Sequence, residues 1–139
     1  WYDSFFNEIN KKNNFLSNII YKGKIMYLLS IVLPEKSLED RLRFSKKELS
    51  WCVENESLIW KYFIENNLLF SNREKDYRSY LKYGPFSKGM TKDSPSRISY
   101  FIGAQIIDRY MSRNSDVSIN DLMLQTDHMT ILNNSKYKP

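Results

Sequence analysis

The side chains that commonly perform nucleophilic or metal chemistry are scarce in this chain of 139 residues. His128 is the single histidine and Cys52 is the single cysteine. A serine or cysteine nucleophile would have to use His128, which lies near an expected helix start, and no glycine-rich nucleophile turn is present. One histidine and one cysteine also cannot complete a zinc site built from His and Cys ligands. We therefore predict no catalytic residue, no metal ligand and no cofactor within this chain.

Other patterns that carry chemistry are also missing or weak. The HExxH, CxxC, phosphate-binding and dinucleotide-binding motifs do not occur. Glu54 and Glu56 could pair for general acid–base catalysis, but they lie at an expected helix junction among polar residues, which favours solvated carboxylates. Cys52 lies between Trp51 and Val53 and cannot form an internal disulfide, so we interpret it as a small buried hydrophobic residue.

The positive charge of the chain is moderate and dispersed. The formal net charge is +5 and the pI is near 9.2. No run of five or more basic residues occurs, and short basic–aromatic pairs such as Lys82-Tyr83 are too far apart in the chain to predict a nucleic-acid surface. We therefore expect no nucleic-acid partner. The lysines that this interpretation places on a solvated surface are Lys11, Lys12, Lys22, Lys24, Lys36, Lys46, Lys47, Lys136 and Lys138.

Composition and length predict one helical domain. Hydrophobic residues make up 42% of the chain and aromatic residues 15%, which is enough for a packed core, and only four glycines and four prolines occur, which disfavours a turn-rich β-sandwich. Apolar residues recur at steps of three and four, as in helices. We predict a compact, multi-helix, all-α domain over residues 1–139. The chain begins at Trp1 and shows no apolar run of about 20 residues, so we expect it to be part of a longer protein.

The N-terminal third should contain two or three helices. Apolar spacing predicts helix over residues 1–20, with a break at Asn13-Asn14. Gly23 is expected to interrupt the next segment, and residues 24–33 form a nearly continuous apolar run that predicts a buried helix ended by Pro34. Residues 34–44 are polar and should form a surface connection.

The middle of the chain carries a clear helix start. Ser45 and Glu48 match a capping box, in which each side chain bonds the other residue's backbone N–H. The helix that follows should turn Leu49, Cys52 and Val53 inward. A second helix is expected over residues 55–66 and a short charged helix over residues 72–82.

The C-terminal part is expected to contain the central helix. Ser94-Pro95 predicts a helix start, with the serine as N-cap and the proline at the first helical position, and the helix should run to Ser112 or Arg113. Gly103 lies inside this helix at a cost of about 1 kcal/mol relative to alanine, which the close approach of another backbone would explain. Further N-caps are expected at Ser118, in a capping box with Asp121, and at Thr126-Asp127. The apolar stripe of the central helix consists of Ile98, Phe101, Ile102, Ile106 and Tyr110, extended by Tyr100, Ala104, Ile107 and Met111.

Several segments, taken together in order and spacing, resemble the C-terminal region of the gliding-motility lipoproteins of the GldB family. Each is a weak motif alone, but together they span nearly the whole chain. Family members often show glycine or tryptophan where this chain has Ser96 and Ala104. The segments are residues 21–27 (YKGKIMY) with Leu33-Pro34, residues 49–51, 55–56, 59–63 and 68–71, residues 84–87 (GPFS), residues 94–98 (SPSRI), residues 101–107 (FIGAQII) with Tyr110-Met111, and residues 135–139 (SKYKP).

The resemblance implies a location, a process and a scaffold. It implies a cell-envelope lipoprotein of Bacteroidetes, anchored in the membrane by an N-terminal acyl-cysteine that this chain lacks and facing the periplasm. It also implies a role in gliding motility and in type IX secretion. The family is distantly similar to zinc peptidases with an HExxH motif, in which a glutamate of a Glu-Gly-x-Ala segment completes the metal site. Here the comparable segment reads Lys22-Gly23-Lys24, so a cation would replace that ligand in a zincin-like helical protein.

Two functional hypotheses follow. In the first, the protein is a non-enzymatic envelope component that binds other envelope proteins of the gliding and secretion machinery. Its contact points would be the loop at Pro85 and Phe86 and the tail residues Lys136, Tyr137 and Lys138, whose aromatic and basic side chains suit an interface. In the alternative, the protein is a zinc-dependent peptidase whose HExxH half lies outside this chain, and Lys22 is then the wrong residue at its position.

Overall fold

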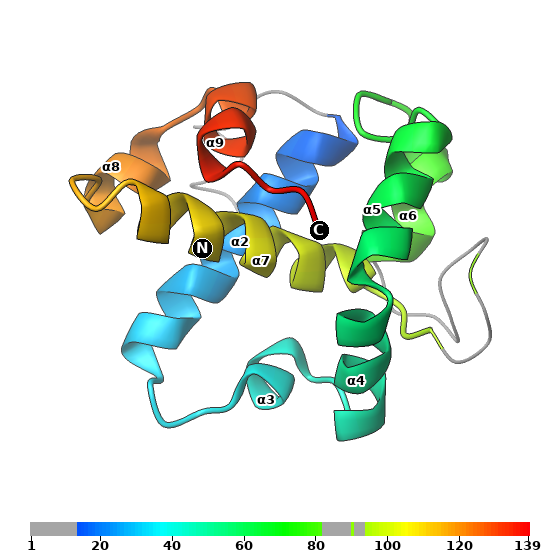
Figure 1. Ribbon diagram of the computed structural model, residues 1–139, viewed down its shortest axis with the longest axis horizontal. Coiled ribbons are helices and arrows are strands. Elements are labelled where there is room, and N and C mark those ends of the chain that lie inside the picture. The colour runs from blue at the N-terminus through cyan, green and yellow to red at the C-terminus, as the bar shows by residue number, and fades with distance from the viewer. Residues whose placement is uncertain (1–13, 82–89, 91–93) are drawn as a thin grey trace.

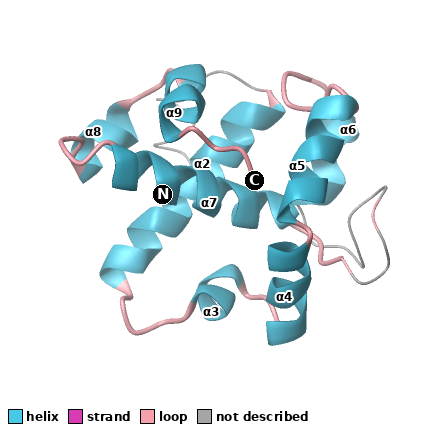
Figure 2. Ribbon diagram, in the orientation of Figure 1, coloured by secondary structure: helices cyan, strands magenta, loops and turns pink. Residues whose placement is uncertain are grey.

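The computed structural model describes residues 14–81, 90 and 94–139, and within these residues the chain is helical and contains no strand (Figure 2). The prediction of an all-α fold is therefore confirmed. The expected helix in residues 1–13 and the loop at Pro85 and Phe86 lie outside the described residues. The helices are α2 (Phe15–Val32), α3 (Leu38–Leu42), α4 (Lys46–Glu54), α5 (Glu56–Glu65), α6 (Glu74–Leu81), α7 (Ile98–Arg113), α8 (Ile119–Leu124) and α9 (His128–Ser135).

Helix α7 is the centre of the fold, as its wide apolar stripe predicts. It crosses α2 along the most extensive helix–helix contact of the described residues, and it also packs against α9 and α6 (Figure 1). A helix that contacts neighbours on several sides must be apolar around most of its circumference. The buried residues of α7 are Ile98, Ser99, Phe101, Ile102, Gly103, Ala104, Ile106, Ile107 and Tyr110.

The crossing of α2 and α7 is made by two glycines in backbone contact. A Cβ atom placed on Gly103 would lie 2.8 Å from the Gly23 nitrogen and still closer to the Ile19 carbonyl oxygen. A Cβ atom on Gly23 would overlap the Gly103 carbonyl group and lie 2.7 Å from the Ile107 side chain. The prediction that another backbone approaches Gly103 is therefore confirmed, and the partner is Gly23.

Most of the predicted helix starts are confirmed. Ser45 Oγ accepts a hydrogen bond from the Glu48 N–H at 3.1 Å, and Glu48 Oε1 accepts from the Ser45 N–H at 2.9 Å. The same reciprocal pair links Ser118 and Asp121. Asp127 caps α9, and Asn14 caps α2 at the predicted break. These pairs satisfy backbone N–H groups that a helix leaves unbonded in its first turn.

Two predictions for the N-terminal third are wrong. Gly23 does not interrupt a helix: α2 runs through it without a break, because the contact with α7 outweighs the poor helix propensity of glycine. Residues 34–44 are not simply a surface connection, because they contain the short helix α3. Leu42 is fully buried and Phe44 nearly so, which fastens this segment to the core.

Two further predictions fail for local geometric reasons. Ser94-Pro95 does not begin the central helix; α7 begins at Ile98, and Arg97 precedes it in the left-handed conformation, with φ of 56°. Val53 does not face inward, since 59% of it is exposed. It follows the fully buried Cys52 by one residue, which on a helix corresponds to a rotation of about 100°.

By length and composition alone, α2 could cross a membrane: it has 18 residues with a mean hydropathy of 1.2. Half of this stretch is buried inside the fold, where it packs against α7. The burial identifies α2 as a core helix of the domain and gives a structural reason for its apolar sequence. The exposed apolar residues lie at its C-terminal end, at Ile31, Val32 and Leu33.

The glycine crossing gives a first prediction. Gly103→Ala should lower the free energy of unfolding by about 2 kcal/mol, because overpacking typically costs about 1–3 kcal/mol and the overlap here is with rigid backbone, whereas the gain in helix propensity is about 1 kcal/mol at most. Urea unfolding followed by circular dichroism at 222 nm measures this change. Ser112→Ala, at an exposed position of the same helix, is the control. A Gly103→Ala variant as stable as this control would contradict the backbone contact.

Candidate functional site

Lys22, which the resemblance places at a lost zinc ligand, lies half-buried on α2 beside two tyrosine rings. Its Nζ is 5.0 Å from the centroid of the Tyr21 ring and 5.3 Å from that of Tyr100 on α7. An ammonium group at these distances is attracted by the ring faces, and it has no lone pair to offer a metal. The position is therefore filled by a cation–π contact. Its assignment to a former metal site stays a prediction, because it rests on the resemblance.

The donor atoms near Lys22 do not form a metal site within the part of the chain that the structure describes. No group of three His, Cys, Asp or Glu side chains in these residues could hold a metal ion. The buried His128 begins α9. Cys52 is fully buried, and burial, with smaller contributions from Glu48 and Glu56, raises the pKa of its thiol to about 12. A thiol in that state is not a nucleophile, so the interpretation of Cys52 as a buried hydrophobic residue is confirmed.

Glu56 has a structural partner. Its Oε2 accepts a hydrogen bond from the Tyr137 hydroxyl at 2.7 Å. Burial, followed by the interaction with Glu56, raises the pKa of the Tyr137 hydroxyl above its usual range. The prediction of a solvated carboxylate is right for the exposed Glu54 but wrong for the half-buried Glu56. Glu56 therefore fixes the C-terminal tail to α5.

Lys24 is a buried charged residue that the sequence pattern did not predict. It is 0% exposed, and its Nζ donates a hydrogen bond to the Gln125 carbonyl oxygen at 2.7 Å. Gln125 is the C-cap of α8, where unbonded carbonyl groups attract a cation. Burial lowers the pKa of Lys24 from 10.5 to about 8. The placement of Lys24 on the solvated surface is therefore wrong.

The predicted contact residues of the tail line a groove, which we call the tail groove. It has a volume of about 740 Å³ and lies where the tail leaves α9 and passes α5 (Figure 1). The side chains of Lys136 and Lys138 are exposed at this groove. The residues that line it are Trp60, Ile64, Leu132, Asn133, Lys136, Tyr137 and Lys138.

Tyr137 is a buried residue of this groove. Only 4% of it is exposed, and its ring packs edge-on against Trp60 with ring centroids 5.1 Å apart. The guanidinium of Arg109 lies over the same ring, 5.8 Å from its centroid. The hydrogen bond to Glu56 and the contact with Trp60 hold the ring inside, where it forms a wall of the groove. The role of Tyr137 as a partner contact stays a prediction.

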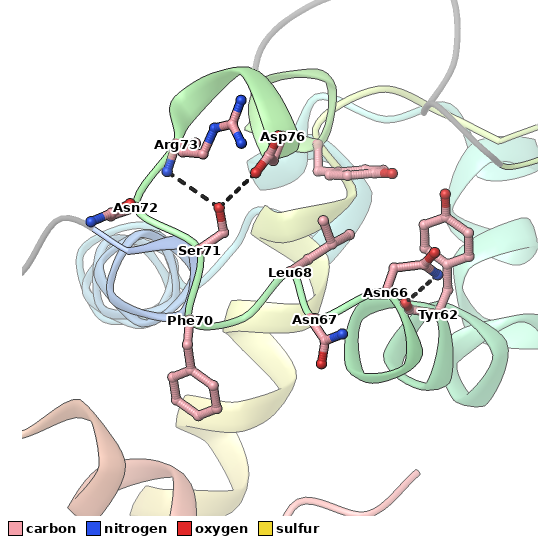
Figure 3. A pocket seen from close by; sticks show the side chains of 10 residues that line it. Tyr62, Asn66, Asn67, Leu68, Phe70, Ser71, Asn72, Arg73 and Asp76 are labelled. Atoms are coloured by element: carbon pink, nitrogen blue, oxygen red, sulfur yellow. Dashed lines mark hydrogen bonds between the residues drawn. The ribbon is translucent and has the colours of Figure 1, made fainter.

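A second cavity, of about 710 Å³, lies at the connection between α5 and α6 (Figure 3). Several of its polar side chains bond other side chains or the backbone of the same segment: Ser71 Oγ donates to Asp76 Oδ2 at 2.9 Å and accepts from the Arg73 backbone N–H at 3.2 Å. Asn66 donates to the Tyr62 carbonyl oxygen at 2.9 Å. These bonds shape a turn before α6, and we assign them that structural role.

Comparison with known proteins gives one match. The family model described as "Gliding motility protein GldB" matches residues 1–139, the whole length of the chain. No curated protein and no solved structure gives a significant match.

The buried ammonium group gives a second prediction. Because the pKa of Lys24 is about 8 in the folded state and 10.5 when solvated, the unfolded chain binds more protons between these pH values, and stability should rise as the pH increases through this window. We expect the free energy of unfolding to rise by about 2 kcal/mol more between pH 7.5 and pH 9.5 in the wild type than in Lys24→Met. Urea titrations at both pH values measure the difference. Tyrosine and cysteine ionisation affects both proteins alike, so parallel pH profiles would contradict the burial of a titrating Lys24.

Proposed function

The chain belongs to the GldB family of gliding motility proteins, and from this premise we propose that it is a non-enzymatic, membrane-anchored component of the cell envelope. It supports gliding motility and type IX protein secretion by binding other envelope proteins. It faces the periplasm, and a lipid on an N-terminal segment outside this chain holds it to the membrane.

The tail groove is the observation that carries this proposal. It combines an aromatic wall, formed by Trp60 and Tyr137, with the aliphatic side chain of Ile64, which is 52% exposed. Aromatic residues surrounded by polar and basic side chains are typical of the centre of a protein interface. The groove can therefore accept one apolar side chain of a partner protein.

The charge around the groove indicates the kind of partner. Lys136 and Lys138 are exposed, and Arg109 lies over the Tyr137 ring. The Glu56 carboxylate accepts the Tyr137 hydrogen bond and is half-buried. The groove thus presents a basic rim, and the segment that it binds carries an apolar residue flanked by aspartate or glutamate. Complementary charge of this kind raises association rates and specificity.

The chemistry of the described residues supports a binding role over catalysis. The Cys52 thiol stays protonated in the core, Glu56 is engaged by Tyr137, and Lys22 is held by aromatic rings. A general base or nucleophile needs a pKa near neutrality and access to substrate. Cys52 has no access to substrate, and Glu56 and Lys22 are engaged by neighbouring side chains.

The groove gives a third prediction. In cells that produce the full-length protein, the triple variant Ile64→Ser, Lys136→Glu, Lys138→Glu should lose most colony spreading and most secretion of type IX cargo, because partner affinity should fall at least about tenfold when an anchor and two rim charges are changed. The matched control is Leu58→Ser, Lys46→Glu, Lys47→Glu, which makes the same chemical changes at exposed positions outside the groove.

Two outcomes would contradict the proposal separately. Normal spreading of the groove variant, at wild-type abundance by immunoblot, would exclude the groove as the partner site. Stoichiometric zinc in the purified full-length protein, together with peptide hydrolysis that a chelator abolishes, would contradict the non-enzymatic role and favour a peptidase.

A further inference from the structure

A third cavity, of about 600 Å³, brings together three arginines from distant parts of the chain. Arg41 and Arg43 come from α3 and its C-cap, and Arg97 precedes α7. None of the described lining residues is acidic. We call this cavity the arginine pocket. Sequence spacing gave no sign of it, because Arg97 lies 54 residues after Arg43.

Arg97 is held rigidly within the arginine pocket. It is 8% exposed, and its guanidinium carbon lies 5.5 Å from the ring centroids of both Phe44 and Tyr100. Its Nη2 donates to the Arg43 carbonyl oxygen at 3.5 Å, a long hydrogen bond. A planar guanidinium fixed between aromatic rings loses little further freedom when it binds an anion. This arginine is therefore preorganised.

The backbone at two of these arginines has an uncommon conformation. Arg97 has φ of 56° and Arg43 has φ of 59°, both in the left-handed region. For a residue other than glycine, asparagine or aspartate this conformation costs roughly 1 kcal/mol or more. At Arg43 the left-handed residue is the C-cap of α3, a common way for a helix to end, whereas at Arg97 it directly precedes α7.

Arg41 and Arg43 add two further positive charges to the arginine pocket. Within the described residues, neither forms an ion pair with a carboxylate. Arg41 Nε makes a long hydrogen bond, of 3.4 Å, to the Ser37 carbonyl oxygen. The Asp108 carboxyl interacts electrostatically with Arg41, and burial raises the pKa of that carboxyl. Guanidinium groups that share a cavity repel one another, and an anion between them removes the repulsion.

Part of the lining of the arginine pocket is apolar. Ile25, Met26 and Leu29 of α2 and Leu81 of α6 line it. At helical spacing, Ile25, Leu29 and Leu33 follow one face of α2, and this face ends in the exposed residues Val32 and Leu33. In Figure 1, α3 follows this end of α2. The cavity therefore joins a cationic side to an apolar strip that reaches the surface.

We propose that the arginine pocket binds a phosphate ester with an apolar substituent, with the phosphate on Arg41, Arg43 and Arg97 and the apolar part along Ile25 and Leu29. Planar guanidinium groups match phosphate oxygens in pairs, and the aliphatic wall accepts hydrocarbon. Such a ligand is either the headgroup region of a phospholipid or a soluble phosphoester. The inference does not depend on the tail groove, because the two sites share no lining residue.

The test uses the 139-residue chain and three probes: vesicles of phosphatidylglycerol and phosphatidylcholine, monomeric dihexanoyl phosphatidylglycerol, and inorganic phosphate. Isothermal titration and vesicle co-sedimentation should show binding that Arg41→Gln, Arg43→Gln weakens at least tenfold. The control Lys46→Gln, Lys47→Gln removes the same charge from exposed positions outside the cavity and should change the affinity less than twofold. Circular dichroism verifies that each variant folds.

The three probes distinguish a phospholipid from a soluble phosphoester, and the two double variants show whether the proposal fails. If the protein binds vesicles and inorganic phosphate does not compete, the ligand is a phospholipid. If the protein binds the monomeric lipid and inorganic phosphate displaces it, the ligand is a soluble phosphoester. Equal loss in both double variants would show attraction of a basic surface to anionic lipid and would overturn the proposal. Absence of binding to all three probes would overturn it as well. Neither result would affect the tail groove, whose readout is colony spreading.

Discussion

The contact between Gly23 and Gly103 is the constraint on which the rest of the structure depends. Two helix backbones can touch only where both residues lack a Cβ atom, so this pair fixes where α2 and α7 cross. Lys22 and Lys24 flank Gly23. Side chains two positions apart on a helix point in directions that differ by about 200°. Lys22 therefore reaches Tyr100 near the start of α7, while Lys24 reaches Gln125 at the end of α8. The two neighbouring cations therefore lie on opposite faces of α2, with Lys24 buried in the fold.

The helix starts at Ser45, Ser118 and Asp127 could be predicted because a cap is made within four residues and needs no tertiary contact. The start of α7 could not, although Ser94-Pro95 has the right residue types. The chain there turns through a left-handed Arg97 whose guanidinium packs between Phe44 and Tyr100. That conformation is set by contacts with a segment more than 50 residues away, and local propensity carries no information about it.

The candidate sites show the same division between local and distant information. Basic and aromatic residues in the tail predicted a contact surface, and Lys136 and Lys138 do line a groove. The pattern could not show that Tyr137 is bonded to Glu56, 81 residues earlier. The dispersed pattern of basic residues predicts a solvated Lys24, whereas its neighbours in space are the core and the end of α8. A lysine's burial is decided by the packing of helices, and in this chain the glycine crossing decides it.

The basic residues that give the chain its net positive charge therefore lie in several different environments. Lys24 is buried and bonded to a carbonyl group, at a cost in stability that a neutral residue would avoid. Lys136 and Lys138 border a groove that also has apolar lining residues, and we propose that their charge selects among partners. The three arginines surround a cavity with an aliphatic wall, and the fold holds two of them in a costly backbone conformation. The exposed Lys136 has the same left-handed backbone at the end of α9, so the shared cavity, rather than the backbone conformation, distinguishes the arginines. Three guanidinium groups at one cavity match the oxygen atoms of an anion, and this is the role that we propose for the arginines and not for the lysines.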